Sequence, residues 1–253
     1  MIIPKIKVLH SHGWQYIPDL NAVTLTEEFR GRPVLTPTAD MRDVEAAAKL
    51  CPTKAITTAP FTLDLGKCLF CGECALRAPK NISFTNDYKI ASTSREALVV
   101  KPGDDKIEFH PENVRPEIPK LFGDALKLRQ VSAAGDASVE MELNASGNVN
   151  FDFGRYGVDF VASPRHADGV VITGPISQNM AEALDICYKS IPEPKLVIVC
   201  GSEACSGGLY AESKAVNRQF LEQYPVDLWL PGTPTHPMTF IDGVMNLLGK
   251  KTR

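Results

Sequence analysis

Three cysteines, Cys68, Cys71 and Cys74, form a C-x-x-C-x-x-C run, and a fourth, Cys51, is followed by a proline. Such a run brings three thiolates into one short loop, which suits the separate irons of a 4Fe-4S cluster. A structural zinc site normally uses two well-separated C-x-x-C pairs. Zinc binding and vestigial cysteines are the alternatives left open. Disulfides are disfavoured, because the count of seven cysteines is odd and the start of the chain has no signal-peptide pattern.

The spacing resembles that of two-cluster ferredoxins, in which C-x2-C-x2-C-x3-C-P occurs twice and the fourth cysteine of each unit binds the other unit's cluster. Cys51-Pro52 corresponds to the end of the first unit. The ligand positions that lack cysteine all belong to one cluster; they hold Met41, Val44, Ala47 and Ala78. The other cluster keeps its complete set. The sequence therefore predicts one 4Fe-4S cluster, bound by Cys51, Cys68, Cys71 and Cys74.

Composition restricts the classes of function. The net charge of -3 gives no indication of binding to nucleic acid, and no apolar run is long enough to span a bilayer. We expect a protein without a direct membrane span, located in the cytoplasm, where iron–sulfur clusters are assembled. A peripheral position on the cytoplasmic side of a membrane complex is compatible with this expectation.

Four segments follow from the distribution of motifs and breakers. We expect an irregular N-terminal lead (1–30), a ferredoxin-like 4Fe-4S domain (31–92), a proline-rich and charged linker or arm (93–120), and an α/β domain (121–253). In the ferredoxin-like domain the patterns indicate a helix over 40–50 with Asp40 as N-cap, a hairpin over 55–65 and a second helix over 72–79.

The last segment alternates apolar strands with helical patterns. The expected strands are 158–163, 169–174, 195–200 and 226–231, and the expected helices are 177–190, 209–224 and 236–251. This order predicts a flavodoxin-like, doubly wound parallel sheet with its site at the carboxyl ends of the strands. The fold class is therefore α/β, preceded by a small α+β ferredoxin-like domain. Cys187 and Cys200 are interpreted as buried core thiols.

Three motifs in this segment, SPRHADGVVITGPIS, EPKLVIVCGSEACSGG and VDLWLPGTPTHP, resemble the small electron-transfer subunit of energy-converting [NiFe] hydrogenases. The same subunit occurs in formate hydrogenlyase and next to the quinone site of complex I. The resemblance covers about residues 121–249. It implies a flavodoxin-like domain that carries a proximal 4Fe-4S cluster.

The ligands of that proximal cluster are missing from this chain. The four family positions are occupied by Asp136, Val139, Glu203 and Thr233, with Cys205 two places late. Carboxylates are poor substitutes for thiolates on soft irons. The surrounding family residues are kept: Pro164, Arg165, His166, Asp168, Gly207, Gly208, Pro231, Gly232 and Pro234. We therefore expect a vacant cluster position in an otherwise retained scaffold.

The resemblance implies an electron-transfer subunit of a membrane-associated, complex I-like or hydrogenase-related oxidoreductase, rather than a stand-alone catalyst. The alternatives are a non-redox structural subunit with a fold-stabilising cluster and a free-standing ferredoxin-like carrier. The implied partners are a hydrogenase-large-subunit-like protein and other subunits of the complex, and a ferredoxin-type donor is a further candidate. We expect the large subunit to contact a face that bears Arg165, His166 and the loops at 201–208 and 231–237. The simplest role for Arg165 is an ion pair with Asp168.

Overall fold

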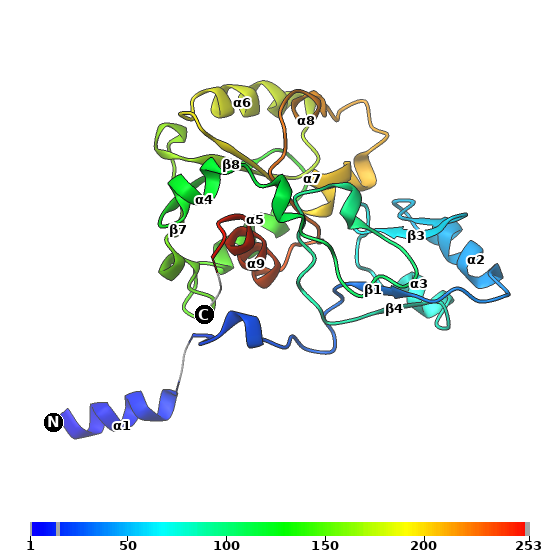
Figure 1. The fold of residues 1–253 in the computed structure, drawn as a ribbon, viewed down its shortest axis with the longest axis horizontal. Helices are drawn as coiled ribbons and strands as arrows, with labels where there is room; N and C mark the ends of the chain where they lie inside the picture. Colours follow the sequence, from blue (N-terminus) through cyan, green and yellow to red (C-terminus); the bar gives the residue numbers. More distant parts are fainter. Residues whose placement is uncertain (1, 14–15, 251–253) are drawn as a thin grey trace.

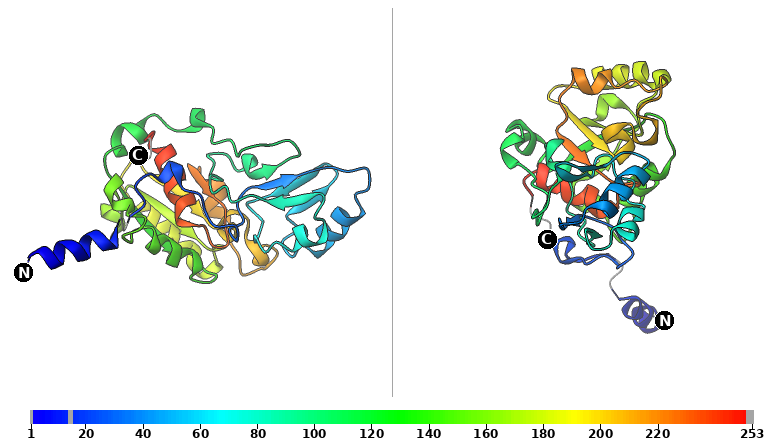
Figure 2. Two further views of the ribbon diagram at one scale, coloured as in Figure 1. Left: turned by 90° about the horizontal axis from the view of Figure 1, so that it is seen from below. Right: turned by 90° about the vertical axis from the view of Figure 1, so that its right-hand side faces the viewer.

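The computed structural model describes residues 2–13 and 16–250. These residues form an N-terminal helix, a small lobe and a large lobe (Figure 1). Helix α1 (Ile2–His12) projects from the body at one end of the molecule, and the small lobe lies at the other end (Figure 2). The expectation of an irregular lead is therefore wrong for its first residues. Further along the lead, the 3-10 turn η1 (Leu20–Ala22) packs on the large lobe, where Leu20 is buried.

The small lobe contains two short antiparallel sheets and two helices. One sheet pairs β1 (Pro33–Leu35) with β4 (Ile82–Phe84), and the other has the order β2 (Ile56–Thr58), β3 (Phe61–Asp64), β5 (Val99–Val100). The helices are α2 (Arg42–Leu50) and α3 (Glu73–Arg77). The expected hairpin and both expected helices are thus present. Asp40 lies one residue before the N-cap position, Met41, and its carboxylate accepts a hydrogen bond from the Arg42 N–H.

The arm expected over 93–120 is in part structured within the small lobe. The 3-10 turn η2 (Glu96–Leu98) leads into β5, in which Val100 pairs with Leu63. A second 3-10 turn, η3 (Pro111–Asn113), precedes helix α4 (Glu117–Phe122) of the large lobe. The prolines and charges in this arm gave no indication of β5, because this strand forms only by pairing with the distant strand β3.

The large lobe is built on a five-stranded parallel sheet. Its order is β10 (Leu228–Leu230), β9 (Leu196–Cys200), β8 (Gly169–Thr173), β6 (Leu126–Ser132), β7 (Val158–Phe160). Numbered within the lobe this is the order 2-1-3-4-5, which is the flavodoxin-like arrangement. All five residues of β8 and of β9 are buried, as expected of central strands covered on both faces.

Helices cover both faces of this sheet (Figure 1). On one face α4, α5 (Ser138–Ala145) and α9 (Pro237–Leu247) pack with Leu128, Val171 and Ile198. On the other face α6 (Gln178–Lys189) and α8 (Gln219–Gln223) pack with Val170 and Val199. The remaining short elements are α7 (Ser202–Ser206) and the 3-10 turns η4 (Phe153–Tyr156), η5 (Pro164–His166) and η6 (Gly208–Tyr210).

The helix expected over 209–224 is largely absent, because residues 215–217 pair with another loop. The Gln178 N–H donates to the Ala215 carbonyl, and the Asn217 N–H donates to the Ile176 carbonyl. A bridge between Ser177 and Val216 completes this contact. Only α8 remains helical at the end of the segment.

The two lobes share one hydrophobic core. The apolar cluster that fills the small lobe, with Leu63 and Leu65 at its centre, continues into the sheet face that bears Val170 and Val199. A backbone bridge between Ser92 and Trp229 joins the lobes as well. The small lobe is therefore fixed against the carboxyl ends of the parallel strands.

Candidate metal centre

The structure brings the four cysteines of the predicted cluster to one pocket of the small lobe. Cys51 follows α2, Cys68 and Cys71 lie in the loop after β3, and Cys74 lies on α3. The rest of the lining is mainly apolar and includes Ala47, Leu50, Ala55, Ile56, Leu63, Leu69 and Phe84. Four sulfur donors in an apolar setting match the thiolate ligation of an iron–sulfur cluster.

Backbone N–H groups are directed at two of these sulfurs. The Ala55 N–H donates to Cys51 Sγ at 3.3 Å, and the Phe70 N–H donates to Cys68 Sγ at 3.2 Å. Phe70 has a positive φ of 53°, so its N–H reaches the sulfur through a conformation that is uncommon outside glycine. Such bonds stabilise thiolate charge and tune the potential of a cluster bound there.

Burial makes two of the thiols reluctant to ionise on their own. It raises the pKa of Cys68 to about 12 and that of Cys74 to about 11, and the neighbouring cysteines add to both shifts. Deprotonation of this set therefore requires compensating positive charge, which bound iron would supply. In residues 2–13 and 16–250 no group of three or more His, Cys, Asp or Glu is arranged around a single ion. Each thiolate of a 4Fe-4S cluster binds a separate iron, so its ligands are spaced more widely than those of one ion.

The residues at the predicted positions of a lost second cluster belong to the core or pack against it. Val44, Ala47 and Ala78 are each at most 1% exposed, and the partly buried Met41 packs against the same cluster. Hydrocarbon side chains thus occupy these positions, and one of them, Ala47, also lines the four-cysteine pocket.

A second pocket lies at the carboxyl ends of the parallel strands. Its lining includes all four residues at the predicted vacant positions: Asp136, Val139, Glu203 and Thr233. The motif-based alignment placed these residues together, and the structure does bring them to one site. Gly174, Ser202 and Gly232 complete the lining with Ser138.

The carboxylate of Glu203 and a methyl group of Val139 fill part of this second pocket. A Cβ at Gly135 would lie 2.3 Å from Glu203 Oε2, and one at Gly201 would lie 2.8 Å from Val139 Cγ2. Burial raises the pKa of Glu203, and the charges of Asp136 and Glu140 raise it further. Glu140, which the sequence analysis did not single out, is 8% exposed and accepts the Thr173 hydroxyl hydrogen bond at 2.5 Å.

The two pockets adjoin each other across the lobe interface. Thr233 Oγ1 lies 3.5 Å from the Cys68 carbonyl oxygen, and Ser202 Oγ lies 3.4 Å from the carbonyl oxygen of Leu65. Ser202 also accepts a hydrogen bond from the Gly232 N–H at 3.1 Å. A residue at a predicted vacant position therefore lies against the backbone of a predicted cluster ligand.

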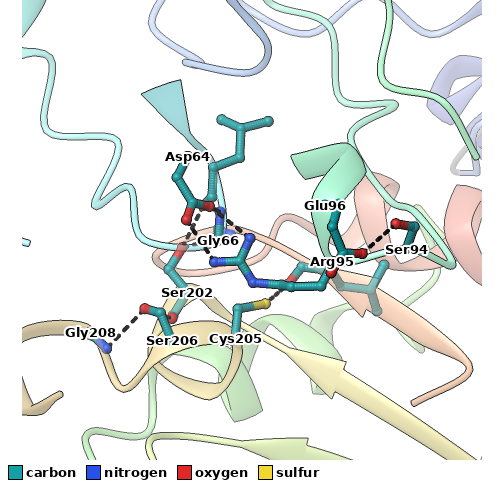
Figure 3. A network of polar contacts seen from close by, with 12 residues as sticks. Asp64, Gly66, Ser94, Arg95, Glu96, Ser202, Cys205, Ser206 and Gly208 are labelled. Carbon is teal, nitrogen blue, oxygen red and sulfur yellow. Dashed lines mark hydrogen bonds and ion pairs between the residues drawn. The ribbon is translucent and has the colours of Figure 1, made fainter. Parts of the chain in front are cut away.

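Two arginines that the sequence analysis missed hold the loop of Cys68 and Cys71. Arg95 forms a bidentate ion pair with Asp64, whose carboxylate also accepts the Gly66 N–H bond (Figure 3). Arg30 donates to the Phe70 carbonyl at 2.5 Å. Neither contact has a sequence signal, because the partners are 31 and 40 residues apart.

The prediction for Arg165 and His166 needs correction. Both are exposed, and Asp168 accepts a hydrogen bond from the Lys127 N–H instead of pairing with Arg165. The loop of Arg165 and His166 thus lies beside Lys127, near the start of β6. Lys127 is five residues, or about 16 Å along the strand, from the carboxyl end of β6 at Ser132. The structure therefore separates Arg165 and His166 from the loops at 201–208 and 231–237, which follow the carboxyl ends of β9 and β10.

Comparison with known proteins shows which family the large lobe resembles. Residues 137–247 match the model of the family described as NADH ubiquinone oxidoreductase, 20 Kd subunit. The B subunit of the NADH-quinone oxidoreductase of Heliobacterium modesticaldum is 40% identical over 119 residues, which are 47% of this chain and 68% of that protein. The chain belongs to this family. The corresponding protein of Desulfovibrio desulfuricans is 42% identical over 113 residues, 45% of this chain and 61% of that protein.

A solved structure is also similar. It is that of the membrane-bound sulfane sulfur reductase, described as an archaeal respiratory membrane complex; the match has a TM-score of 0.46 and 25% identity and covers 53% of this chain and 75% of the other. The 20 Kd subunit match begins at Ala137, after all four cysteines of the small lobe. The family assignment therefore concerns the large lobe. The cysteine pocket is supported by its own residues and geometry alone.

Proposed function

We propose that this chain is the iron–sulfur electron-transfer subunit of a membrane-associated, complex I-like or [NiFe] hydrogenase-related oxidoreductase. It carries one 4Fe-4S cluster on Cys51, Cys68, Cys71 and Cys74. The proposal rests above all on one observation: these cysteines line one pocket, packed directly against a lobe of the 20 Kd subunit family. A hydrogenase-large-subunit-like protein and other subunits of the complex are the proposed partners.

A 4Fe-4S cluster, when bound, takes up and releases one electron. The chain's own residues hold the four thiolates in place, and the N–H groups of Ala55 and Phe70 stabilise their charge. The apolar lining shields the buried Cys68 from water, whereas Cys71 is exposed. Arg95, through Asp64, and Arg30, through the Phe70 carbonyl, keep the ligand loop in position.

A second candidate function is non-redox coupling between subunits, with a cluster that only stabilises the small lobe. The carboxylate-containing pocket at the family's cluster position favours this candidate. Glu203 and Val139 occupy that position with groups that are unsuited to iron of a cubane. The usual route of electrons through the large lobe is then missing, and the loops at 201–208 and 231–237 join the two lobes of this chain through Ser202 and Thr233.

No helix in the described part of the chain is long and apolar enough to cross a membrane. We place the chain peripherally on the cytoplasmic side of the complex. In this position the large lobe contacts the other subunits, and the small lobe extends from it (Figure 2).

Iron and acid-labile sulfide analysis tests the proposal. Anaerobically purified protein should contain about four irons and four sulfides per chain, with one S = 1/2 signal on reduction in electron paramagnetic resonance. Stoichiometric zinc without sulfide, or eight irons, would contradict it. The reduction potential and reduction by the intact complex then separate the electron-transfer role from the structural one.

The vacant position has its own test. Cysteines are introduced together at the four lining positions: Asp136→Cys, Val139→Cys, Glu203→Cys and Thr233→Cys. If the pocket keeps the family geometry, reconstitution should add about four irons per chain. No gain would mean that the loops have moved away from that geometry.

A further inference from the structure

Helix α1 stands apart from both lobes (Figure 1). Every side chain from Ile3 to His12 is exposed. Among them Ile3, Ile6 and Leu9 are 69%, 57% and 70% exposed, and none of the three belongs to a hydrophobic cluster of the lobes. The described part of the chain therefore leaves these three aliphatic side chains uncovered, which indicates a binding surface.

The three aliphatic residues form one row along α1. They are three positions apart, so each follows the last along the same side of the helix. Lys7 lies four positions after Ile3, and Lys5 lies four positions before Leu9. Because four positions exceed one turn of the helix, these two lysines are rotated away from the row in opposite directions. One lysine therefore borders each side of the row.

The charge of this segment is positive. Residues 1–18 contain two lysines, two histidines and no Asp or Glu, in a chain whose net charge is -3; the first acidic residue is Asp19. His10, four positions after Ile6, ends the row with an amphipathic ring, which tolerates the boundary between water and lipid. A helix with an aliphatic row, lysines on both borders and no acids is typical of segments that lie on anionic lipid.

The length of α1 decides how it meets a membrane. Its 11 residues rise about 16 Å, roughly half of the hydrocarbon core of a bilayer, so in contact with a membrane it lies in the plane of the surface. The chain returns to the large lobe at Ile17, whose N–H donates to the Asn150 carbonyl at 2.8 Å. Because the small lobe lies at the other end of the molecule (Figure 2), α1 can bind a surface without covering the four-cysteine pocket.

We propose that α1 is an interfacial membrane anchor, in which Ile3, Ile6 and Leu9 insert among lipid headgroups while Lys5 and Lys7 bind anionic lipid phosphates. The inference rests on the proposed membrane association and names the surface that makes it, but it is independent of the cluster. Each lysine buries its apolar stem beside the row and keeps its ammonium group at the level of the phosphates. Binding strength then depends on the buried apolar area and on attraction to anionic lipid, which can be tested separately.

Co-sedimentation of the full chain with vesicles tests the electrostatic contribution. The parent protein should bind vesicles of mixed phosphatidylcholine and phosphatidylglycerol about tenfold or more tightly than vesicles of phosphatidylcholine alone, and added salt should reduce this preference. Lys5→Glu with Lys7→Glu should remove the preference. Lys80→Glu with Lys120→Glu makes the same change in charge at exposed positions outside α1 and should leave it intact.

Two matched substitutions test the apolar row. Ile6→Asn should weaken binding about fivefold or more, because it withdraws an aliphatic side chain from the lipid. Val8, which is 52% exposed, lies about 200° around the helix from Ile6 and therefore on the opposite side. Val8→Asn should weaken binding by less than about twofold. Equal losses in the two variants would refute the proposed face.

Iron analysis of the same preparations separates this inference from the cluster. Iron without binding to anionic vesicles refutes the anchor alone, whereas binding without iron refutes the cluster alone. Equal binding to both kinds of vesicle refutes recognition of anionic lipid. In the assembled complex a photo-crosslinker at position 6 should capture lipid; capture of a subunit instead would overturn the inference, because α1 would then be a protein interface.

Discussion

Replacement of Arg95 by methionine probes the contacts that hold the loop of Cys68 and Cys71. Arg95 Nη1 and Nη2 lie 2.8 and 2.9 Å from the two carboxylate oxygens of Asp64, and the side chains are 21% and 16% exposed. The backbone carbonyl of Asp64 accepts hydrogen bonds from Lys67 and Cys68. Asp64 thereby links the ion pair to the turn that carries the first cysteine of the run.

The expected cost follows from burial. Removing one partner of a fully buried ion pair costs about 3–5 kcal/mol, because the other charge is left desolvated. Here both side chains keep some contact with water, and Asp64 retains the Gly66 N–H bond at 2.9 Å. We therefore expect Arg95→Met to destabilise the loop by about 2–3 kcal/mol. Methionine preserves much of the apolar stem, so the loss is mainly electrostatic.

Hydrogen exchange at the Cys68 amide measures this cost locally, without assuming two-state unfolding of a metal-binding, two-lobed protein. A double-mutant cycle with Asp64→Asn isolates the pair: the double variant should be more stable than the sum of the single effects predicts. Arg77→Met is the control, since its pair with Asp43 is 3.7 Å long and about half exposed. We expect at most about 0.5 kcal/mol there.

The reasoning is refuted if Arg95→Met changes the exchange of the Cys68 amide by less than about 0.5 kcal/mol. It is also refuted if the two substitutions are additive, because the carboxylate and the guanidinium would then not stabilise each other. A loss of protection in the control equal to that in Arg95→Met would point to a general effect of removing positive charge.

Three further predictions concern other parts of the chain. Cys74→Ser should abolish iron binding and increase the protease sensitivity of the small lobe, whereas Cys205→Ser should leave the iron content unchanged, because buried Cys205 lies outside the four-cysteine pocket. Burial raises the pKa of Asp242 to about 6, so this carboxyl should contribute a loss of stability on the order of 3 kcal/mol between about pH 4 and 6, because the unfolded state ionises first; urea denaturation should show this contribution as a difference in pH dependence between the parent and Asp242→Asn, and identical pH profiles would contradict the assignment. Gly174→Ala should lower the melting temperature strongly, at a cost on the order of 3–5 kcal/mol, because Gly174 has φ +77° and a Cβ there would lie 1.7 Å from the Ala134 carbonyl oxygen; a change below about 1 kcal/mol would show that this close approach can relax.

Local patterns were sufficient for the elements that contain their own signal. The all-apolar runs of β8 and β9 and the periodic pattern of α6 were recognised from the sequence, and their limits agree with the structure to within about one or two residues. The four cysteines could be grouped from spacing alone, because three of them share one loop. That they hold a cluster stays a prediction from chemistry.

Where long-range pairing competed with local propensity, the sequence-based expectation failed. Residues 215–217 have a helical pattern, but their backbone hydrogen bonds go to the loop at 176–178. Val99 and Val100 lie in a segment rich in breakers, yet they complete the sheet of β3. A single sequence does not indicate which distant strand or loop will compete for these backbone groups.

The sequence by itself determined which residue types stand at each predicted site: four thiols in the spacing of an iron–sulfur motif, and four predicted family positions without cysteine. Only the tertiary structure decided that the two sites adjoin, with Thr233 beside the Cys68 carbonyl across 165 positions of the chain. It also decided that Arg95 holds the loop of Cys68 and Cys71 and that Arg165 lies away from the loops at 201–208 and 231–237. Ligand identity is a property of residues and their spacing, whereas contact between lobes depends on how separately specified surfaces pack together.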